Sequence, residues 1–275
     1  MHTQDDTALP TSVFQDLIAG IHPDRILTQP TANGEAIRVA VVDSGVDTEV
    51  LQQKHPQMKV VAGGIFRPNE PQPFPFLGKQ SSPHGTTVAD ILLRIAPAIS
   101  LYSADVFGNT GTTDIDTLLH ALEYILEKWP CQIINLSLGV SEARLIQPAK
   151  RQQFARLIER AYYQGISVFA AAHNEHPLVK SYPAVFGTAL ISVDKGLFPT
   201  PLQFGYNVGD TIEFRAHGRG YLGPFSREPT TSWATPHLAG IAARILSMKP
   251  DLKPFELKTI LYWLCQHWNN RCTQE

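Results

Sequence analysis

Four short runs of mainly apolar residues constrain the fold of this chain more than any other feature of its sequence. They are rich in β-branched residues, which is typical of strands covered on both faces of a sheet. The runs are IRVAVV at 37–42, ISLYSADVF at 99–107, IINLSL at 133–138 and ISVFAAA at 166–172. Because strands covered on both faces occur mainly in parallel sheets, we expect a mostly parallel central sheet.

Segments with helical periodicity separate these runs. Between Ile115 and Trp129, apolar residues recur at a spacing of 3.6, and Thr113 is the predicted N-cap of this helix. Further predicted helices cover 148–164 (ending at Gly165), 233–248 and 255–268, whereas the Gly- and Pro-rich segment 63–83 is predicted as a loop and 185–216 as shorter strands and loops. This alternation predicts an α/β fold with helices on both faces of the sheet.

Length and composition limit the classes of protein to consider. The 275 residues show no internal repeat, so we expect one domain over 37–275 and a polar, turn-rich N-terminal extension over 1–36 that packs on or near it. The net charge of −2 offers no basic excess for binding nucleic acid, and no apolar run approaches the ~20 residues that span a bilayer.

The N-terminus and the cysteines favour an intracellular protein. No Lys or Arg precedes Arg25, and the first residues contain no apolar segment typical of a signal peptide. Cys131, Cys265 and Cys272 are widely spaced and form no CxxC pair, so we expect reduced thiols. The sequence therefore predicts a cytoplasmic location.

Three segments place polar side chains where chemistry is expected. Asp43 follows the first strand, at the sheet edge where α/β proteins bind ligands, while His84 and Ser232 each open a predicted helix. An acid, a base and a hydroxyl are the groups that nucleophilic catalysis by serine requires, because an imidazole must remove the hydroxyl proton. Each residue alone is more often structural, as a cap, a turn former or a core residue.

A fourth segment makes the pattern specific. Asn174 follows the strand at 166–172, and its amide is suited to stabilise an oxyanion. The motifs DSG at Asp43, HGT at His84, AAHNE at Asn174 and TSWATPHLAG at Ser232 occur in the order found in subtilases, which the chain resembles from about Arg38 to Leu264. The resemblance implies a subtilisin-like fold and a serine endopeptidase in which Ser232 is the nucleophile, His84 the general base and Asp43 its orienting acid.

The resemblance also implies where a peptide substrate binds. In subtilases the substrate lies as an extended strand between two segments that correspond here to 136–139 and 107–111. The substrate-binding residues that this implies are Ser137, Leu138, Gly139, Ala171, Ala172, His173, Phe107 and Gly108. A peptide or protein is therefore the expected partner, and the sequence does not indicate an oligomeric state.

Four residues depart from the family pattern. Thr230 and His173 stand where glycine is usual, Trp233 where methionine is frequent and His217 where proline is usual. Thr230 suggests a rearranged turn before the serine, and His173 either narrows the specificity pocket or points to solvent. A peptide-binding pseudoprotease therefore remains an alternative to a processing protease that trims leader peptides or activates a partner protein.

No cofactor or metal site is predicted. The helix after His84 lacks the insertion with which many subtilases bind calcium, and His173, Glu175 and His176 do not have the spacing of a zinc site. The short N-terminal segment excludes a full inhibitory prodomain within this sequence, although residues 9–20 could dock at the cleft as a flap.

Overall fold

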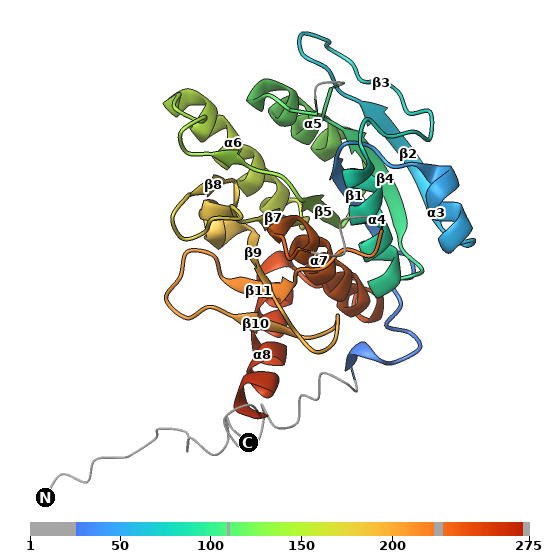
Figure 1. Cartoon of the computed structure of the whole chain (residues 1–275), viewed down its shortest axis with the longest axis vertical. Coiled ribbons are helices and arrows are strands. Elements are labelled where there is room, and N and C mark those ends of the chain that lie inside the picture. The colour runs from blue at the N-terminus through green and yellow to red at the C-terminus, as the bar shows by residue number, and fades with distance from the viewer. Residues whose placement is uncertain (1–25, 109–110, 223–227, 272–275) are drawn as a thin grey trace, which may run out of the picture.

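A computed structural model describes residues 26–108, 111–222 and 228–271, with side chains to residue 266. A nine-stranded sheet runs through the molecule in the order β10-β11-β9-β7-β5-β1-β4-β2-β3 (Figure 1). The strands from β11 to β2 pair in parallel, and only β10 and β3 at the two edges pair antiparallel. The sheet strands are β1 (Arg38–Asp43), β2 (Lys59–Ile65), β3 (Phe74–Pro75), β4 (Ser100–Asp105), β5 (Ile133–Leu136), β7 (Ser167–Ala171), β9 (Ile191–Gly196), β10 (Phe204–Tyr206) and β11 (Phe214–His217).

Helices cover both faces of the sheet, which confirms the predicted fold class. Alternate residues of β1 belong to different cores: Val39 and Val41 belong to the core that also contains residues of α4, α7 and α8, whereas Ala40 and Val42 belong to the core that contains residues of α5 and α6. This division follows from the period of two along a strand. The helices are α3 (Thr48–Lys54), α4 (Pro83–Ile95), α5 (Ile115–Lys128), α6 (Pro148–Tyr163), α7 (Thr231–Met248) and α8 (Pro254–Arg271), with a 3-10 helix at Ala184–Ala189 and a small ribbon of β6 (Val140–Ser141) and β8 (Ser181–Tyr182).

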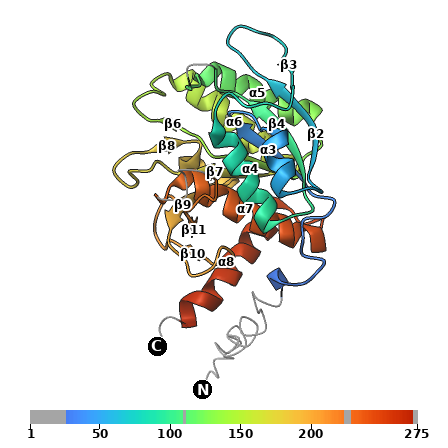
Figure 2. The same ribbon diagram turned by 45° about the vertical axis from the view of Figure 1, so that its right-hand side comes forward.

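Helix α7 lies at the centre of this arrangement, beside α4 and against the sheet (Figures 1 and 2). Its first sixteen residues are buried except Ser232 and Arg244, and Gly240 allows close packing against Ile95 of α4. Pro236 interrupts the helix without ending it. The residue that we expect to carry the chemistry therefore stands on an enclosed helix.

Two sequence predictions need correction. Segment 63–83 is not entirely a loop, because β2 continues to Ile65 and pairs with Phe74–Pro75. Gly63 permits this pairing, since a Cβ there would lie 2.6 Å from the ring of Phe76. The N-cap of α5 is Asp114 rather than Thr113, because its carboxylate accepts the N–H of Thr117 at 2.9 Å.

Helix boundaries differ by a few residues from the predictions. Helix α7 begins at Thr231, two residues before the predicted start, and α8 begins at Pro254 and continues to Arg271. The predicted apolar stripe of α5 is confirmed, since its members from Leu118 to Leu126 are buried and Ile115 packs against the same core.

The described part of the N-terminal extension packs against the domain. Leu27 and Ala32 are buried, and the Arg244 guanidinium of α7 donates to the carbonyl oxygens of both and to that of Ile95. Residues 1–25, which include the flap suggested at 9–20, and Cys272 lie outside the described residues.

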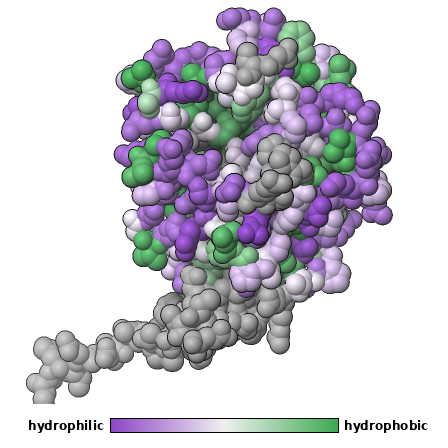
Figure 3. Space-filling model, viewed as in Figure 1, coloured by the Kyte–Doolittle hydropathy of each residue, from purple (hydrophilic) through white to green (hydrophobic). Residues whose placement is uncertain are grey.

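A bilayer requires a spanning helix to be long and apolar. Within the described ranges, every helix is too short or too polar to cross a bilayer. The face shown in Figure 3 is mainly hydrophilic, with apolar residues dispersed among polar ones.

Candidate active site

Asp43 occupies the carboxyl end of β1, a central strand of the sheet. Its side chain is fully buried, and Oδ1 accepts the N–H of Ser44 at 2.8 Å. The chain then turns at Gly45, whose φ of +80° is accessible to glycine but strained for other residues. This turn leaves Asp43 pointing at the start of α4.

Helix α4 presents His84 to that carboxylate. Pro83 starts the helix, and His84 Nδ1 lies 2.8 and 2.9 Å from the two oxygens of Asp43. The close approach depends on Gly85, because a Cβ there would lie 2.2 Å from the carbonyl oxygen of Gly45. Its N–H also donates to Ser44 Oγ at 2.9 Å. The DSG and HGT motifs therefore contact each other directly.

Two opposing effects determine the pKa of His84. Burial favours the neutral imidazole, whereas the charge of Asp43 and the hydrogen bond to it favour the imidazolium; the pKa of His84 lies above its ordinary value of 6.5 because the effects of Asp43 prevail. The imidazole is only partly covered, with 29% of its side chain exposed. The His84 side chain is therefore still accessible to solvent.

The start of α7 packs directly against His84. Ser232 is the second residue of the helix, and the ring of the next residue, Trp233, lies 4.7 Å from the imidazole ring between centroids. Thr230 is the N-cap with φ −132°, so the backbone has no positive φ at this position. Its hydroxyl is buried without a hydrogen-bond partner.

Asn174 is tied to the same helix terminus. Its Oδ1 accepts the N–H of Thr231 at 3.0 Å and the hydroxyl of Thr231 at 3.2 Å. Because these two donors fix the amide oxygen, the amide nitrogen is left to donate to another acceptor. Asn174 thus presents N–H groups beside the start of α7.

A cavity of about 230 Å³ joins Ser232 and Asn174 to most of the predicted substrate-binding residues. Of the predicted residues, Ser137, Leu138, Gly139, Ala171, Ala172 and His173 line it. Phe107 instead lines an adjoining groove of about 700 Å³, which also contains Leu138, Gly139 and His173. Gly108 is not among the lining residues of either space.

Sequence reasoning missed other residues that shape this cavity. Ser181, Glu175 and Thr231 also line it, and Ser181 Oγ lies 2.1 Å from the position that a Cβ on Gly139 would take. Ser181 therefore fills the space that the missing side chain of Gly139 leaves. The sequence signal that could have indicated Ser181 is the segment SYPA at 181–184, which lies within the stretch that resembles subtilases.

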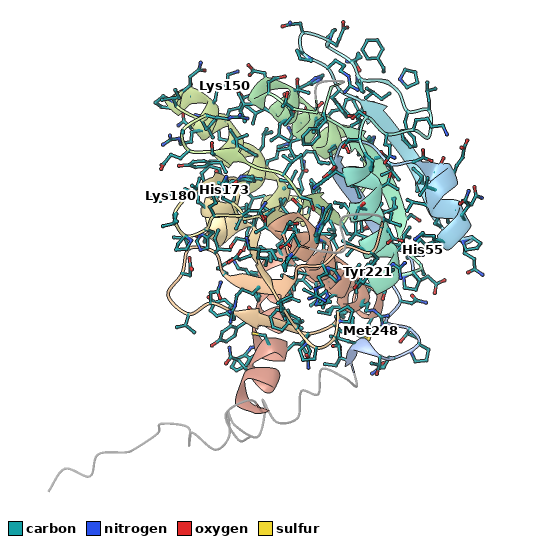
Figure 4. The ribbon with its side chains drawn as sticks, viewed as in Figure 1. His55, Lys150, His173, Lys180, Tyr221 and Met248 are labelled. Carbon is teal, nitrogen blue, oxygen red and sulfur yellow. The ribbon has the colours of Figure 1, made fainter. Side chains whose placement is uncertain are left out.

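His173 stands at a border between cavities. It lines both spaces above and a third one of about 410 Å³, which it shares with Lys180 (Figure 4). Its Nδ1 accepts the N–H of Glu175 at 3.1 Å, while His176 Nε2 lies 3.0 Å from Asp210. Among the residues with described side chains, no group of three or more His, Cys, Asp or Glu could hold a metal ion.

One edge of the larger groove is held by a buried carboxylate. Asp105 accepts the N–H of Phe107 at 3.0 Å and the hydroxyl of Ser81 at 3.0 Å, and it pairs with Arg67 at 3.3 Å. Burial raises the pKa of Asp105 in spite of these stabilising partners. The groove edge at Phe107 is therefore anchored to the end of β4.

Comparison with known proteins decides the family. The sequence profile of the Subtilase family matches residues 34–196, which is more than half of the chain and includes Asp43, His84 and Asn174. The chain belongs to the subtilase family. This membership confirms the predicted resemblance.

Individual relatives extend the match beyond the profile. Subtilisin NAT of Bacillus subtilis subsp. natto is 30% identical over 235 residues, which are 79% of this subtilase and 57% of that protein. Subtilisin Savinase of Lederbergia lenta is 26% identical over 245 residues, 83% of this chain and 82% of the relative. The subtilase thus spans little more than half of subtilisin NAT.

Solved structures share the fold of this subtilase. Sphericase superposes on this chain with a TM-score of 0.64 and a sequence identity of 22%, and the match covers 86% of each chain. A lanthipeptide protease superposes with a TM-score of 0.59 at 20% identity, over 88% of this chain and 87% of that one.

Proposed function

We propose that this subtilase is a serine endopeptidase in which Ser232 attacks the scissile carbonyl. The observation that carries the proposal is the hydrogen-bonded pair of Asp43 and His84. The start of α7 packs against His84, and Ser232 at this start lines a cavity. A serine hydroxyl becomes a competent nucleophile only when a neighbouring base takes its proton.

The proposed reaction proceeds in two halves. As Ser232 Oγ bonds to the carbonyl carbon, its proton passes to His84 Nε2, and the carbonyl oxygen becomes an oxyanion. When the C–N bond breaks, His84 gives that proton to the leaving amine. Water then attacks the acyl-enzyme in the same way and releases the carboxylic acid, which restores the Ser232 hydroxyl.

Asp43 and Asn174 have supporting roles in this proposal. Asp43 accepts the Nδ1–H of His84, which orients the ring and stabilises the imidazolium during each transfer. The amide nitrogen of Asn174 donates to the oxyanion, because Thr231 already occupies the amide oxygen. The Ser232 backbone N–H is a second donor at the helix N-terminus.

The grooves beside Ser232 suit an extended peptide. The side chain before the scissile bond enters the 230 Å³ cavity, and the residues preceding it lie along the 700 Å³ groove between Phe107 and Gly139. Backbone hydrogen bonding by strand addition holds such a substrate, and the pockets select its side chains.

The physiological role that we propose is processing of a specific peptide or protein in the cytoplasm. Cys131 and Cys265 are buried free thiols, which supports a reducing compartment. One protein with this fold is a lanthipeptide protease, which makes removal of a leader peptide one form that this role could take.

A fluorophosphonate probe tests the proposed activity, because it labels only an activated serine. We expect the wild-type protein to be labelled and Ser232→Ala to be unlabelled. Ser100→Ala is the matched control, since Ser100 begins β4 at the opposite edge of the sheet and labelling should persist. A folded wild-type protein that resists the probe and cleaves no peptide library would support the pseudoprotease alternative and refute the proposal.

A further inference from the structure

The ring of Trp233 faces the ring of His84, an arrangement that the sequence pattern did not predict. The ring centroids are 4.7 Å apart and the planes are inclined by 35°, so the indole covers one face of the imidazole. Trp233 itself is 3% exposed, so its ring is held within the core. His84 is therefore restrained at its Nδ1 edge by Asp43 and on one face by an aromatic ring.

The backbone of Trp233 is held by a second buried histidine. His237 Nδ1 lies 2.7 Å from the Trp233 carbonyl oxygen, and its Nε2 lies 2.9 Å from the hydroxyl of Tyr221. A carbonyl oxygen only accepts, so Nδ1 carries the proton of the neutral ring and Nε2 accepts from Tyr221. Burial lowers the pKa of His237 to about 3, so its ring is neutral near pH 7.

Tyr221 is fixed in turn from the side of α4. The Arg94 guanidinium lies 4.6 Å from the centre of the Tyr221 ring, and Arg94 Nε donates to Asp90 at 2.9 Å. Figure 4 shows Tyr221 beside α4 and α7. The contacts thus run from α4 through Tyr221 and His237 to Trp233, and they return to α4 at His84.

We propose that Trp233 is a positioning residue for the general base: its indole holds the His84 imidazole in place and stabilises the imidazolium that forms during proton transfer. This inference rests on the proposed peptidase mechanism. A cation over the face of an indole is attracted by its quadrupole, most strongly when the pair is shielded from water. A flat, buried neighbour also prevents the imidazole from rotating away from Asp43.

Few other groups compete for influence on His84. Asp43 on β1 is the charged group that faces it, while α7 contributes the uncharged Ser232 and Trp233. His237 is neutral behind Trp233, and His217, whose ring lies 5.1 Å from His237, has a pKa lowered by burial. Asp90, farther along α4, is paired with both Arg94 and His55.

Tryptophan fluorescence tests the ring contact without any measurement of activity. A protonated imidazole in contact with an indole quenches its emission, because it accepts an electron from the excited ring. The chain has four tryptophans, so the difference between wild type and Trp233→Phe isolates the emission of Trp233. We expect this emission to rise with pH, with a midpoint above 6.5. The rise should be absent from His84→Gln, which keeps Trp233.

Kinetics test the positioning role. Trp233→Leu keeps an apolar side chain but removes the aromatic face that stabilises the imidazolium. The acid limb of the kcat/KM profile should therefore shift to lower pH by about 0.4–1.5 pH units. We expect kcat to fall about tenfold while KM stays within about twofold, because Trp233 lines neither the cavity beside Ser232 nor the adjoining groove. Trp233→Phe should restore most of both quantities.

The outcomes separate this inference from the proposed function. If wild-type Trp233 emission does not change with pH, or if folded Trp233→Leu keeps the wild-type pH profile and kcat, the positioning role is refuted while fluorophosphonate labelling of Ser232 still supports a peptidase. If the probe fails but the fluorescence step appears and disappears in His84→Gln, the ring contact exists and the peptidase mechanism is wrong. If Trp233→Leu does not fold, the fluorescence titrations of the wild type and of His84→Gln still test the ring contact, and an emission that does not change with pH refutes the inference.

Discussion

Replacing Gly85 by alanine should damage the candidate active site through one steric contact. The new Cβ would lie 2.2 Å from the carbonyl oxygen of Gly45, whereas ordinary contact begins at 3.4 Å. The start of α4 must therefore move by about 1 Å, since a backbone oxygen cannot rotate aside. His84 is the preceding residue, so the same movement stretches its hydrogen bond to Asp43.

The expected size of the effect follows from opposing contributions. Overpacking costs about 1–3 kcal/mol, and the rigid obstacle places Gly85→Ala at the upper end. Alanine recovers about 1 kcal/mol as the better helix former, which leaves a net loss of about 2 kcal/mol. For a chain of this size that loss lowers Tm by about 4–8 °C. A displacement of this order at the base lowers kcat/KM by about 10²-fold.

Calorimetry and peptide hydrolysis measure the two effects, with Gly205→Ala as the matched control. A Cβ on Gly205 meets its nearest neighbour, the Phe198 ring, at 3.6 Å, which is an ordinary contact. Its Tm and activity should match those of the wild type or slightly exceed them. If Gly85→Ala behaves like Gly205→Ala, the close approach of α4 to the Gly45 turn does not determine the geometry of the site.

Three further predictions concern individual groups. Since the neutral form of His84 acts as the base and its pKa lies above 6.5, kcat/KM should fall as the pH decreases through this pKa. Asp43→Asn should move this acid limb of the pH profile to lower pH and reduce kcat by about 10⁴. A limb that stays at the same pH in Asp43→Asn would contradict the role assigned to Asp43. Asn174→Ala should lower kcat by about 10²–10³ with little change in KM, the cost of losing such a donor in subtilisin, so steady-state kinetics that show only a KM effect would exclude the oxyanion role. Burial raises the pKa of Cys131 and of Cys265 to about 12, so neither thiol should react with iodoacetamide at pH 8 until the protein is unfolded, as peptide mass spectrometry can establish.

The central sheet and its helices could be predicted because their signals are strong and local. A run such as IRVAVV has few stable alternatives to a buried strand, and the stripe from Leu118 to Leu126 has few alternatives to an amphipathic helix. The pairing of β2 with β3 depends on contacts around Gly63 and Phe76, which local propensity does not contain. The choice of Asp114 over Thr113 as cap depends on which side chain reaches Thr117 in the folded chain.

In the candidate site, too, some features could be predicted from local sequence motifs and others depend on tertiary contacts. Asp43, His84, Asn174 and Ser232 could be singled out because each lies in a distinctive motif at the end of a strand or the start of a helix. The contact between the rings of Trp233 and His84 could not be foreseen, because it depends on how α7 packs against α4.

The enclosure of α7 has a consequence for self-cleavage under the proposed peptidase activity. A peptidase binds its substrate in an extended conformation, and other copies of the same chain are among the substrates that it meets. The helix that carries Ser232 packs against α4 and the sheet, so it cannot become extended unless the whole domain unfolds. Cleavage of one copy of the chain by another should therefore begin in exposed segments such as 68–72, where every residue is exposed.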